Sequence, residues 1–229
     1  MPTNGNHPQP NWEEAFTAFS LAYGFLSKAF YEPPTTELLH ALVDDDLFAD
    51  WPLPPSDEDT RHGLQLLQDY SHAWSELTEP DLEWDYTRLF IGPGHVLAPP
   101  WESVYLSREH LLFDQPTLEV RRLYAEYGLQ APRLNAEPDD HLGLELAFLV
   151  HLCSLGLAAL HQGENPAALI EAQHRFLGEH LLRWAPQCLE LVIDNANTDY
   201  YRGIAYLTRG CLAQAAVTFS VRLSPAAPL

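Results

Sequence analysis

The sequence predicts an all-α protein: a single domain spanning residues 1–229, folded as a bundle of roughly ten helices around a buried central helix at about 138–160. The central stretch is the first sign, because between Leu142 and Leu160 the only ionisable side chains are Glu145, His151 and Cys153. A helix that is apolar on almost every face is expected to be buried all round. The second sign is composition: helix formers dominate, and the 19 Pro fall in short connecting stretches. No stretch alternates like a strand.

The central helix has a clear predicted start and end. Pro138 suits the first helical turn, and Glu137, Asp139 and Asp140 place negative charge at the positive end of the helix dipole. Gly163 marks its other end. A membrane span is the rival interpretation of such a run, but internal ionisable groups and acidic flanks are costly for a span. We therefore expect a core helix.

The N-terminal half is expected to form short helices separated by Pro. From Asn11 an aromatic stripe repeats every three or four residues until Pro33-Pro34. Later helices stop at a Trp51-Pro connection and at Gly92-Pro93, and Thr78 is a candidate N-cap. Residues 94–105 hold too many Pro for a helix and too many apolar residues for an idle loop, so this segment is expected to pack beside the central helix. The expected helices of this half are 11–30, 35–43, 57–77 and 80–91.

The remaining helices are bounded by similar signals. Ser107 opens a short helix, Pro116 lies in the first turn of the next, and Gly128 closes it. After the central helix, Pro166 and Pro186 each begin a helix and Thr198 caps the last. Loose tails are expected at about 1–10 and 222–229. The expected helices of this half are 107–113, 114–127, 138–160, 165–184, 186–195 and 198–220.

The charge of the chain argues against several partners. It carries 12 Lys and Arg against 32 Asp and Glu, a formal net charge of −20. Nucleic-acid binding and membrane association both call for a basic patch. The acidic field suits a cationic partner, although it also serves solubility alone.

The cysteines and the N-terminus indicate a cytoplasmic protein. The three cysteines, Cys153, Cys188 and Cys211, are widely spaced in apolar helical contexts, which is typical of reduced core residues. The first residues lack the basic and apolar regions of an export signal.

The motifs of the middle of the chain resemble a known family. They are Tyr86-Thr-Arg-Leu-Phe-Ile-Gly-Pro93, Ala98-Pro-Pro-Trp-Glu-Ser-Val-Tyr105 and Glu137-Pro-Asp-Asp-His141. In this order they are similar to the signatures of the DmsD/TorD family of redox-enzyme maturation chaperones, nearer the DmsD branch. The likeness runs from about Trp84 to Tyr206.

The resemblance implies a function. Such proteins are cytoplasmic, helical, non-enzymatic chaperones that bind the twin-arginine (Tat) signal peptide of a molybdenum-cofactor oxidoreductase of the DMSO reductase type and delay its export until the cofactor is inserted. No cofactor or metal of its own is implied. The implied partners are the leader and precursor of one molybdoenzyme, with contact to the Tat export machinery left open. A monomer is the default expectation and a helix-exchanged dimer the alternative.

The resemblance also implies a peptide-binding site and a departure from the branch. Tyr86 stands where relatives often have Trp, and Gly94 replaces a further aromatic, so the preferred leader is expected to differ. Carboxylates would orient the arginines and apolar residues would hold the rest of the leader. Replacing Asp140 or Leu89 by Ala is expected to weaken peptide binding with little change in thermal stability. The implied site residues are Tyr86, Leu89, Phe90, Gly92, Pro93, Trp101, Asp139, Asp140 and His141.

The same residues have a purely structural interpretation. Asp139 and Asp140 would then only stabilise the start of a helix, Leu89 and Phe90 would be plain core, and His141 would be a core histidine satisfied by Glu145.

Two other functions stay open. One is a carboxylate-bridged di-metal enzyme, because Glu37/His40 and Glu171/His174 have the Glu-x-x-His spacing of such bundles. The other is a chaperone that binds only the folded body of its client. No phosphate-binding loop, nucleophile elbow or His-Glu-x-x-His zinc motif is present.

Overall fold

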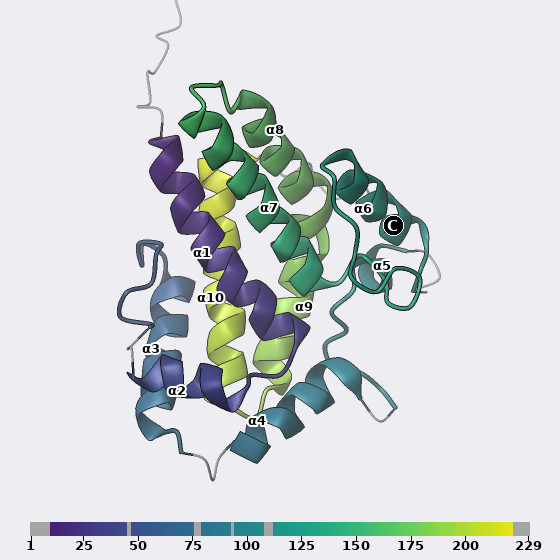
Figure 1. Ribbon diagram of the computed structural model, residues 1–229. Helices are drawn as coiled ribbons and strands as arrows, with labels where there is room; N and C mark the ends of the chain where they lie inside the picture. The colour runs from purple at the N-terminus through teal and green to yellow at the C-terminus, as the bar shows by residue number, and fades with distance from the viewer. Residues whose placement is uncertain (1–9, 45–46, 76–78, 93, 108–111, 222–229) are drawn as a thin grey trace, which may run out of the picture.

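The computed structural model describes residues 10–44, 47–75, 79–92, 94–107 and 112–221, and its regular elements are helices, which confirms the all-α class (Figure 1). They are α1 (Trp12–Tyr31), α2 (Thr36–Asp44), α3 (Glu58–Ala73), α4 (Glu79–Tyr86), the π-helical turn η1 (Thr87–Ile91), α5 (Glu102–Leu106), α6 (Gln115–Glu126), α7 (Leu142–His161), α8 (Ala167–Phe176), the π-helical turn η2 (Leu177–Leu181), α9 (Leu182–Asn195) and α10 (Asp199–Thr218).

The centre of the bundle is the antiparallel pair α1 and α7, which lie side by side in Figure 1. At one end the ring of Tyr31 meets that of His141, with centroids 5.4 Å apart. Toward the other end, Phe16 lies over Gly156, where an added Cβ would come within 2.5 Å of its ring. The pair therefore approaches closely because α7 has glycines where α1 crosses it.

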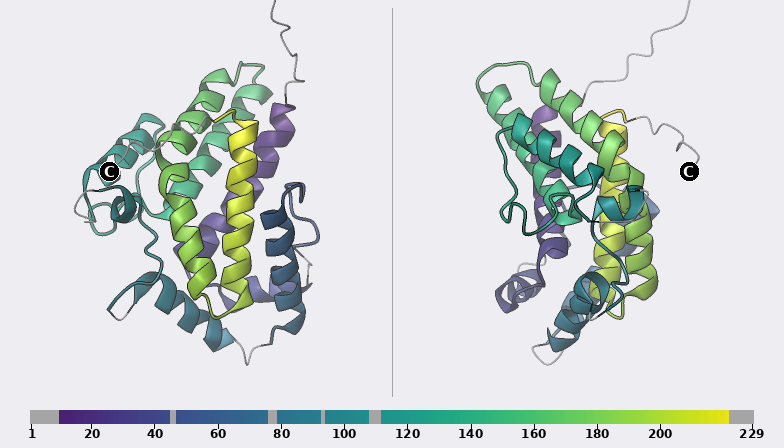
Figure 2. Two further views of the ribbon diagram at one scale, coloured as in Figure 1. Left: turned by 180° about the vertical axis from the view of Figure 1, so that it is seen from behind. Right: turned by 90° about the vertical axis from the view of Figure 1, so that its right-hand side faces the viewer.

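A second antiparallel pair, α3 and α10, packs behind the first (Figure 2). Gly63 of α3 lies against the backbone of α10, with an added Cβ only 2.7 Å from the backbone nitrogen of Leu207. Arg209 of α10 pairs with Asp59 of α3 at 2.6 Å. Phe219 stacks on Trp12 and joins this pair to α1.

The expectation that the central helix is buried all round is wrong. Ala147 and Ser154 are exposed and Leu144 and Val150 are half-buried, so one apolar strip of α7 reaches the surface. Within the described residues, α7 alone is long and apolar enough to cross a membrane, and half of its most apolar window is buried in this bundle. Its contact with α1 along its length is that of a core helix.

The start of the central helix also differs from the expectation. Helix α7 begins at Leu142 rather than near Pro138, because Asp139 and Asp140 form a turn and His141 is extended and pairs with Trp101, just before α5. That segment packs beside α7 as predicted, yet residues 102–106 form the helix α5. The helix expected at 107–113 is not found in its described part, where Leu112 and Phe113 form a turn and Phe113 has φ of +62°. Residues 108–111 lie outside the described chain.

The break expected at Pro186 is displaced. Pro186 lies inside α9, and the irregularity comes earlier, at the π-helical turn η2. Proline removes one donor from the helix ladder, and a wide turn upstream can absorb the change. The predicted N-cap Thr198 is found, accepting from the backbone N–H of Tyr201, and the candidate N-cap Thr78 lies outside the described residues. Asp57 also caps a helix, accepting from the backbone N–H of Thr60.

The three cysteines are buried and free, as expected. Burial raises the pKa of Cys153 and of Cys188 to about 12. Both thiols therefore stay protonated and behave as small apolar core groups.

Two glycine substitutions test the α1–α7 contact. Gly143→Ala is expected to lower the free energy of unfolding by about 1–3 kcal/mol, because the added Cβ would lie 2.8 Å from the Ser27 carbonyl oxygen and 2.8 Å from the Tyr31 Cβ. Gly24→Ala, in the same bundle, meets nothing within 4 Å and is expected to add about 0.5–1 kcal/mol through helix propensity. Urea unfolding of both variants measures the difference. Equal effects would show that the two helices do not approach as described.

Candidate functional site

The second and third sequence motifs are joined by backbone pairing. The N–H of Leu142 donates to the carbonyl of Pro100 at 2.8 Å, and the N–H of Glu102 donates to the carbonyl of Asp140 at 3.0 Å. Trp101 and His141 face each other in an isolated antiparallel bridge. Two segments about 40 positions apart in the sequence thus form one unit at the N-terminus of α7.

Asp140 fastens this unit from inside. Its carboxylate accepts from the backbone N–H of Ser103 and from the hydroxyl of Thr117, both at 2.7 Å, and the side chain is fully buried. Two strong acceptor bonds make the buried charge tolerable. The carboxylate is inaccessible to a peptide. Because Asp140 and Leu89 are both fully buried, we now expect that replacing either by Ala lowers thermal stability, contrary to the expectation from the sequence.

Asp139 is held in the same way by α6. The guanidinium of Arg121 donates to one of its oxygens from Nε at 2.7 Å and from Nη2 at 2.6 Å. The hydroxyl of Tyr124 donates to its backbone carbonyl at 3.1 Å. Both aspartates expected at the peptide site therefore tie α7 to its neighbours.

His141 is the N-cap of α7. Its Nδ1 accepts from the backbone N–H of Gly143 at 3.0 Å, which leaves the proton of the neutral ring on Nε2. Burial lowers the pKa of His141 to about 3. The ring stays neutral at physiological pH and contacts Tyr31 and Trp101 edge to face, with centroids 5.4 and 5.6 Å away.

Glu137, in contrast, is a partly accessible carboxylate at this place. Its side chain is 22% exposed, and it accepts from the hydroxyl of Tyr31 at 3.0 Å. Tyr31 and Trp101 are half-buried beside it. We call the group Tyr31, Tyr86, Trp101, Glu137 and His141 the junction site, because the ends of α1 and α4 and the paired motifs meet there.

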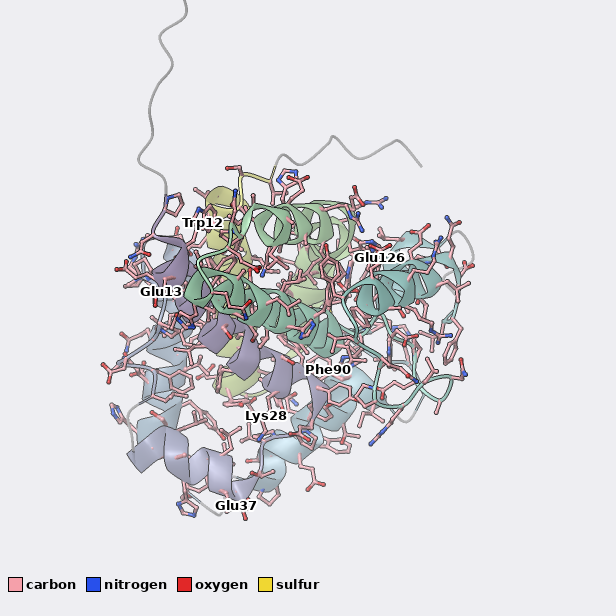
Figure 3. The ribbon with its side chains drawn as sticks, turned by 45° about the horizontal axis from the view of Figure 1, so that its top comes forward. Trp12, Glu13, Lys28, Glu37, Phe90 and Glu126 are labelled. Carbon is pink, nitrogen blue, oxygen red and sulfur yellow. The ribbon has the colours of Figure 1, made fainter. Side chains whose placement is uncertain are left out.

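The first motif reaches the junction site through α1. The hydroxyl of Tyr86 donates to the carbonyl of Phe30 at 3.2 Å. Phe90, labelled in Figure 3, packs on the ring of Phe30 with the ring centroids 5.7 Å apart. Burial, with Glu137 nearby, raises the pKa of Tyr86. Leu89 and Phe90 are fully buried, so the structural interpretation holds for these two. Gly92, at φ of +68°, ends the turn, and Pro93 lies outside the described residues.

A second buried acidic group lies behind the junction site. Glu145 of α7 accepts from the indole N–H of Trp184 at 3.2 Å, and Glu102 pairs with His180 at 3.0 Å. Burial and the adjacent carboxylate of Glu102 raise the pKa of Glu145. His141 is therefore not satisfied by Glu145, which bonds to a different helix.

Residues beyond the predicted set also shape the site. Asp85, directly before the first motif, is buried and accepts from the backbone N–H groups of Asn197 and Thr198 and from the hydroxyl of Thr198. Because Asp85 directly precedes Tyr86 in the sequence, its proximity to the first motif could have marked it as a candidate. Tyr31 gave no such signal, because it lies outside the three motifs and directly follows Phe30, the last residue of an ordinary apolar stripe.

The di-metal alternative is wrong in its geometry. Glu37 and His40 lie in α2 and Glu171 and His174 in α8, at opposite ends of the bundle in both Figure 1 and Figure 2. Across the described ranges, no group of three His, Cys, Asp or Glu side chains could hold a metal ion.

Comparison with known proteins gives consistent relatives. The nitrate reductase delta subunit family matches residues 53–190. The Tat proofreading chaperone DmsD of Salmonella typhi is 32% identical over 200 residues, covering 86% of this chain and 88% of that protein. The chaperone protein TorD of Vibrio parahaemolyticus is 29% identical, covering 68% and 69%. TorD of Vibrio cholerae is 34% identical over 127 residues, covering 56% and 54%.

Substitution of Asp140 tests its structural role. Asp140→Ala is expected to lower the free energy of unfolding by about 2–4 kcal/mol, because it leaves two buried donors without partners. Asp81→Ala, which removes an exposed carboxylate, is expected to change it by less than about 0.5 kcal/mol. Urea titrations followed by circular dichroism give both values. Equal stability of the two variants would mean that Asp140 is not buried as described.

A further prediction concerns pH. The folded-state pKa of His141 is below its unfolded value of 6.5, so its contribution to stability falls as pH falls below 6.5, by about 1.4 kcal/mol per pH unit. The folded-state pKa of Glu145 is above its unfolded value of 4.5, so its contribution falls as pH rises above 4.5. The two slopes oppose each other in wild type.

Variants separate the two slopes. His141→Asn keeps a capping oxygen but no titration, so its stability relative to wild type should improve from pH 6.5 to 4.5. Glu145→Gln should show the opposite trend. Urea unfolding at pH 4.5, 5.5 and 6.5 measures both, and two variants that parallel wild type would contradict the assignment.

Proposed function

This chain belongs to the nitrate reductase delta subunit family and is related to the DmsD and TorD chaperones, and from that premise we propose that it is a system-specific chaperone for a redox enzyme. Its relatives carry the names of chaperones rather than of enzymes. The finer proposal is that it binds, in the cytoplasm, the twin-arginine leader of a molybdenum-cofactor oxidoreductase. Binding delays export until the cofactor is in place.

The single observation that carries the leader-binding proposal is Glu137 in the junction site. A twin-arginine leader offers guanidinium groups next to an apolar helix, so its receptor needs a carboxylate beside aromatic surface. Glu137 supplies a partly exposed carboxylate, and the half-buried rings of Tyr31 and Trp101 flank it. Guanidinium planes also stack on aromatic faces.

Glu137 and the nearby Glu32, at the end of α1, each have a weakly held cation beside them. Arg133 lies 3.9 Å from Glu137, with its own side chain 72% exposed. Lys28 lies 3.8 Å from Glu32, with both side chains about half exposed. Exposed pairs of this kind contribute little to stability. An incoming arginine that forms two parallel bonds can replace them at small cost.

Asp139, Asp140 and His141 have a positioning role in this proposal. Their bonds to Arg121, Thr117 and Gly143 hold the paired motifs in place. Glu137 follows from that placement, because it stands two residues before Asp139. Loss of Asp140 therefore weakens leader binding by distorting the site.

One feature favours a further contact with the body of the client. Trp84 is 57% exposed and Ile91 is 60% exposed on α4 and η1, outside the junction site. Large exposed apolar residues often mark protein interfaces. Trp84→Ser should weaken capture of the whole precursor and leave the isolated leader bound.

Leader binding is tested first with Glu137. Glu137→Gln is expected to weaken binding of a labelled leader peptide about tenfold or more, the loss of one charge-assisted contact, with little change in stability. Glu126→Gln removes the same charge from exposed α6 (Figure 3) and should bind as wild type. Fluorescence anisotropy with a leader peptide and its Lys-Lys form measures this. Equal binding by both variants would place the arginines elsewhere.

The client is identified by affinity capture. The tagged protein is recovered from its own host under conditions that induce molybdoenzymes, and co-purified proteins are identified by mass spectrometry, with Glu137→Gln in parallel. One twin-arginine molybdoenzyme precursor is expected with wild type and is depleted with the variant. If no such precursor is recovered with wild type, the proposed client class is wrong, although a general chaperone role would still stand.

A further inference from the structure

An apolar groove runs along the exposed strip of α7. It has a volume of about 360 Å³ and lies between α7 and the connection from α6. Leu144, Ala147 and Val150 form one wall, and Leu129, Ala131 and Pro132 form the other. We call this the α7 groove. We propose that it binds the apolar helical segment that follows the arginine pair of the leader, an inference that rests on the proposed function.

The lining of the groove favours an apolar occupant. Two of its polar side chains are bonded within the chain: Nε2 of His151 bonds to the carbonyl of Tyr127 at 2.9 Å, and the hydroxyl of Ser154 donates to the carbonyl of Val150 at 3.0 Å. Gln130, also on the lining, is exposed at the surface. Phe148 and Tyr124 lie buried at its floor. An occupant gains by covering apolar surface and finds few free partners for polar groups.

The spacing along α7 fits a helix laid in a groove. Leu144, Ala147, His151 and Ser154 follow at steps of three or four residues, so they lie on one face. A helix bound there would insert side chains at the same spacing. The small volume holds a few such side chains rather than a whole ligand.

The position of the groove identifies which apolar segment it takes. The connection that forms its outer wall at residues 129–132 continues to Glu137 at the junction site. A carboxylate and an apolar groove therefore lie on the same connection, as a cation followed by an apolar helix requires. No Lys or Arg lies on α7 to oppose a cationic leader.

The test places a carboxylate in the groove. Ala147→Glu, at an exposed position, is expected to weaken the full leader about tenfold or more, since it sets an unpaired charge against an apolar helix. Charge alone would strengthen binding of a cationic peptide, so a loss reports the apolar contact. Val217→Glu adds the same charge at an 82% exposed site on α10 and should bind as wild type.

Two peptides separate the inference from the proposed function. The probes are the full leader of a DMSO reductase-type precursor from the host and a short form that ends after the arginines. Ala147→Glu should not weaken binding of the short form, whereas Glu137→Gln weakens binding of both. Wild-type-like binding of the full leader by Ala147→Glu overturns the groove assignment. Failure of wild type to bind either peptide overturns the proposed function instead.

A crosslinking experiment gives a second readout. A photoreactive benzoylphenylalanine at position 147 should crosslink to the apolar part of the leader, and the same group at position 217 should not. Size-exclusion chromatography with light scattering accompanies both proteins. A crosslink between two copies of this chain, with a dimer that Ala147→Glu dissolves, would show that the groove is a self-association surface and contradict the proposal.

Discussion

The pairing between residues 100–103 and 140–142 is the contact on which the functional end of the bundle depends. A Pro-rich segment cannot satisfy its backbone as a helix, and the first N–H groups of a helix have no partner of their own. Here the two segments satisfy each other's backbone groups. The carbonyl of Pro100 accepts from the N–H of Leu142, and the carbonyl of Asp140 accepts from the N–H of Glu102. The start of α7 is fixed by this exchange, and α1 ends against it at Gly143. The junction site follows from these constraints.

Burying several carboxylates in one region is costly unless each has a partner. Asp139 has Arg121, Asp140 has a backbone amide and a hydroxyl, Glu102 has His180 and Glu145 has Trp184. These four buried acidic side chains therefore hold neighbouring segments of the fold together. Cations such as Arg209 and Arg88 are likewise paired with acids of the same chain. The excess negative charge remains at the surface, where it attracts a cationic partner without setting its register.

Local signals in the sequence predicted most of the fold. The stripe of α1 and the cap Thr198 depend on residues within one or two turns, so a pattern suffices to find them. The helix α5 and the late start of α7 depend on pairing between distant segments, which no local pattern contains. The motifs predicted that Tyr86, Trp101 and His141 come together. They did not predict that Asp139 is buried, since its partner Arg121 comes from α6, nor that Tyr31 completes the site.

The departures of this chain from the DmsD branch acquire a physical meaning in the structure. Tyr86 is buried, with its hydroxyl on the carbonyl of Phe30, so it adds no aromatic surface at the junction site. Gly94 adds none either. In the proposed mode of binding, a leader at Glu137 contacts only Tyr31 and Trp101 there, which is too little apolar area for firm binding. The α7 groove supplies the missing area on the same connection. In the proposed mode of binding, Glu137 stands shortly before α7 and the groove lies along it, so the spacing between the arginines and the apolar segment is the property that would distinguish one leader from another.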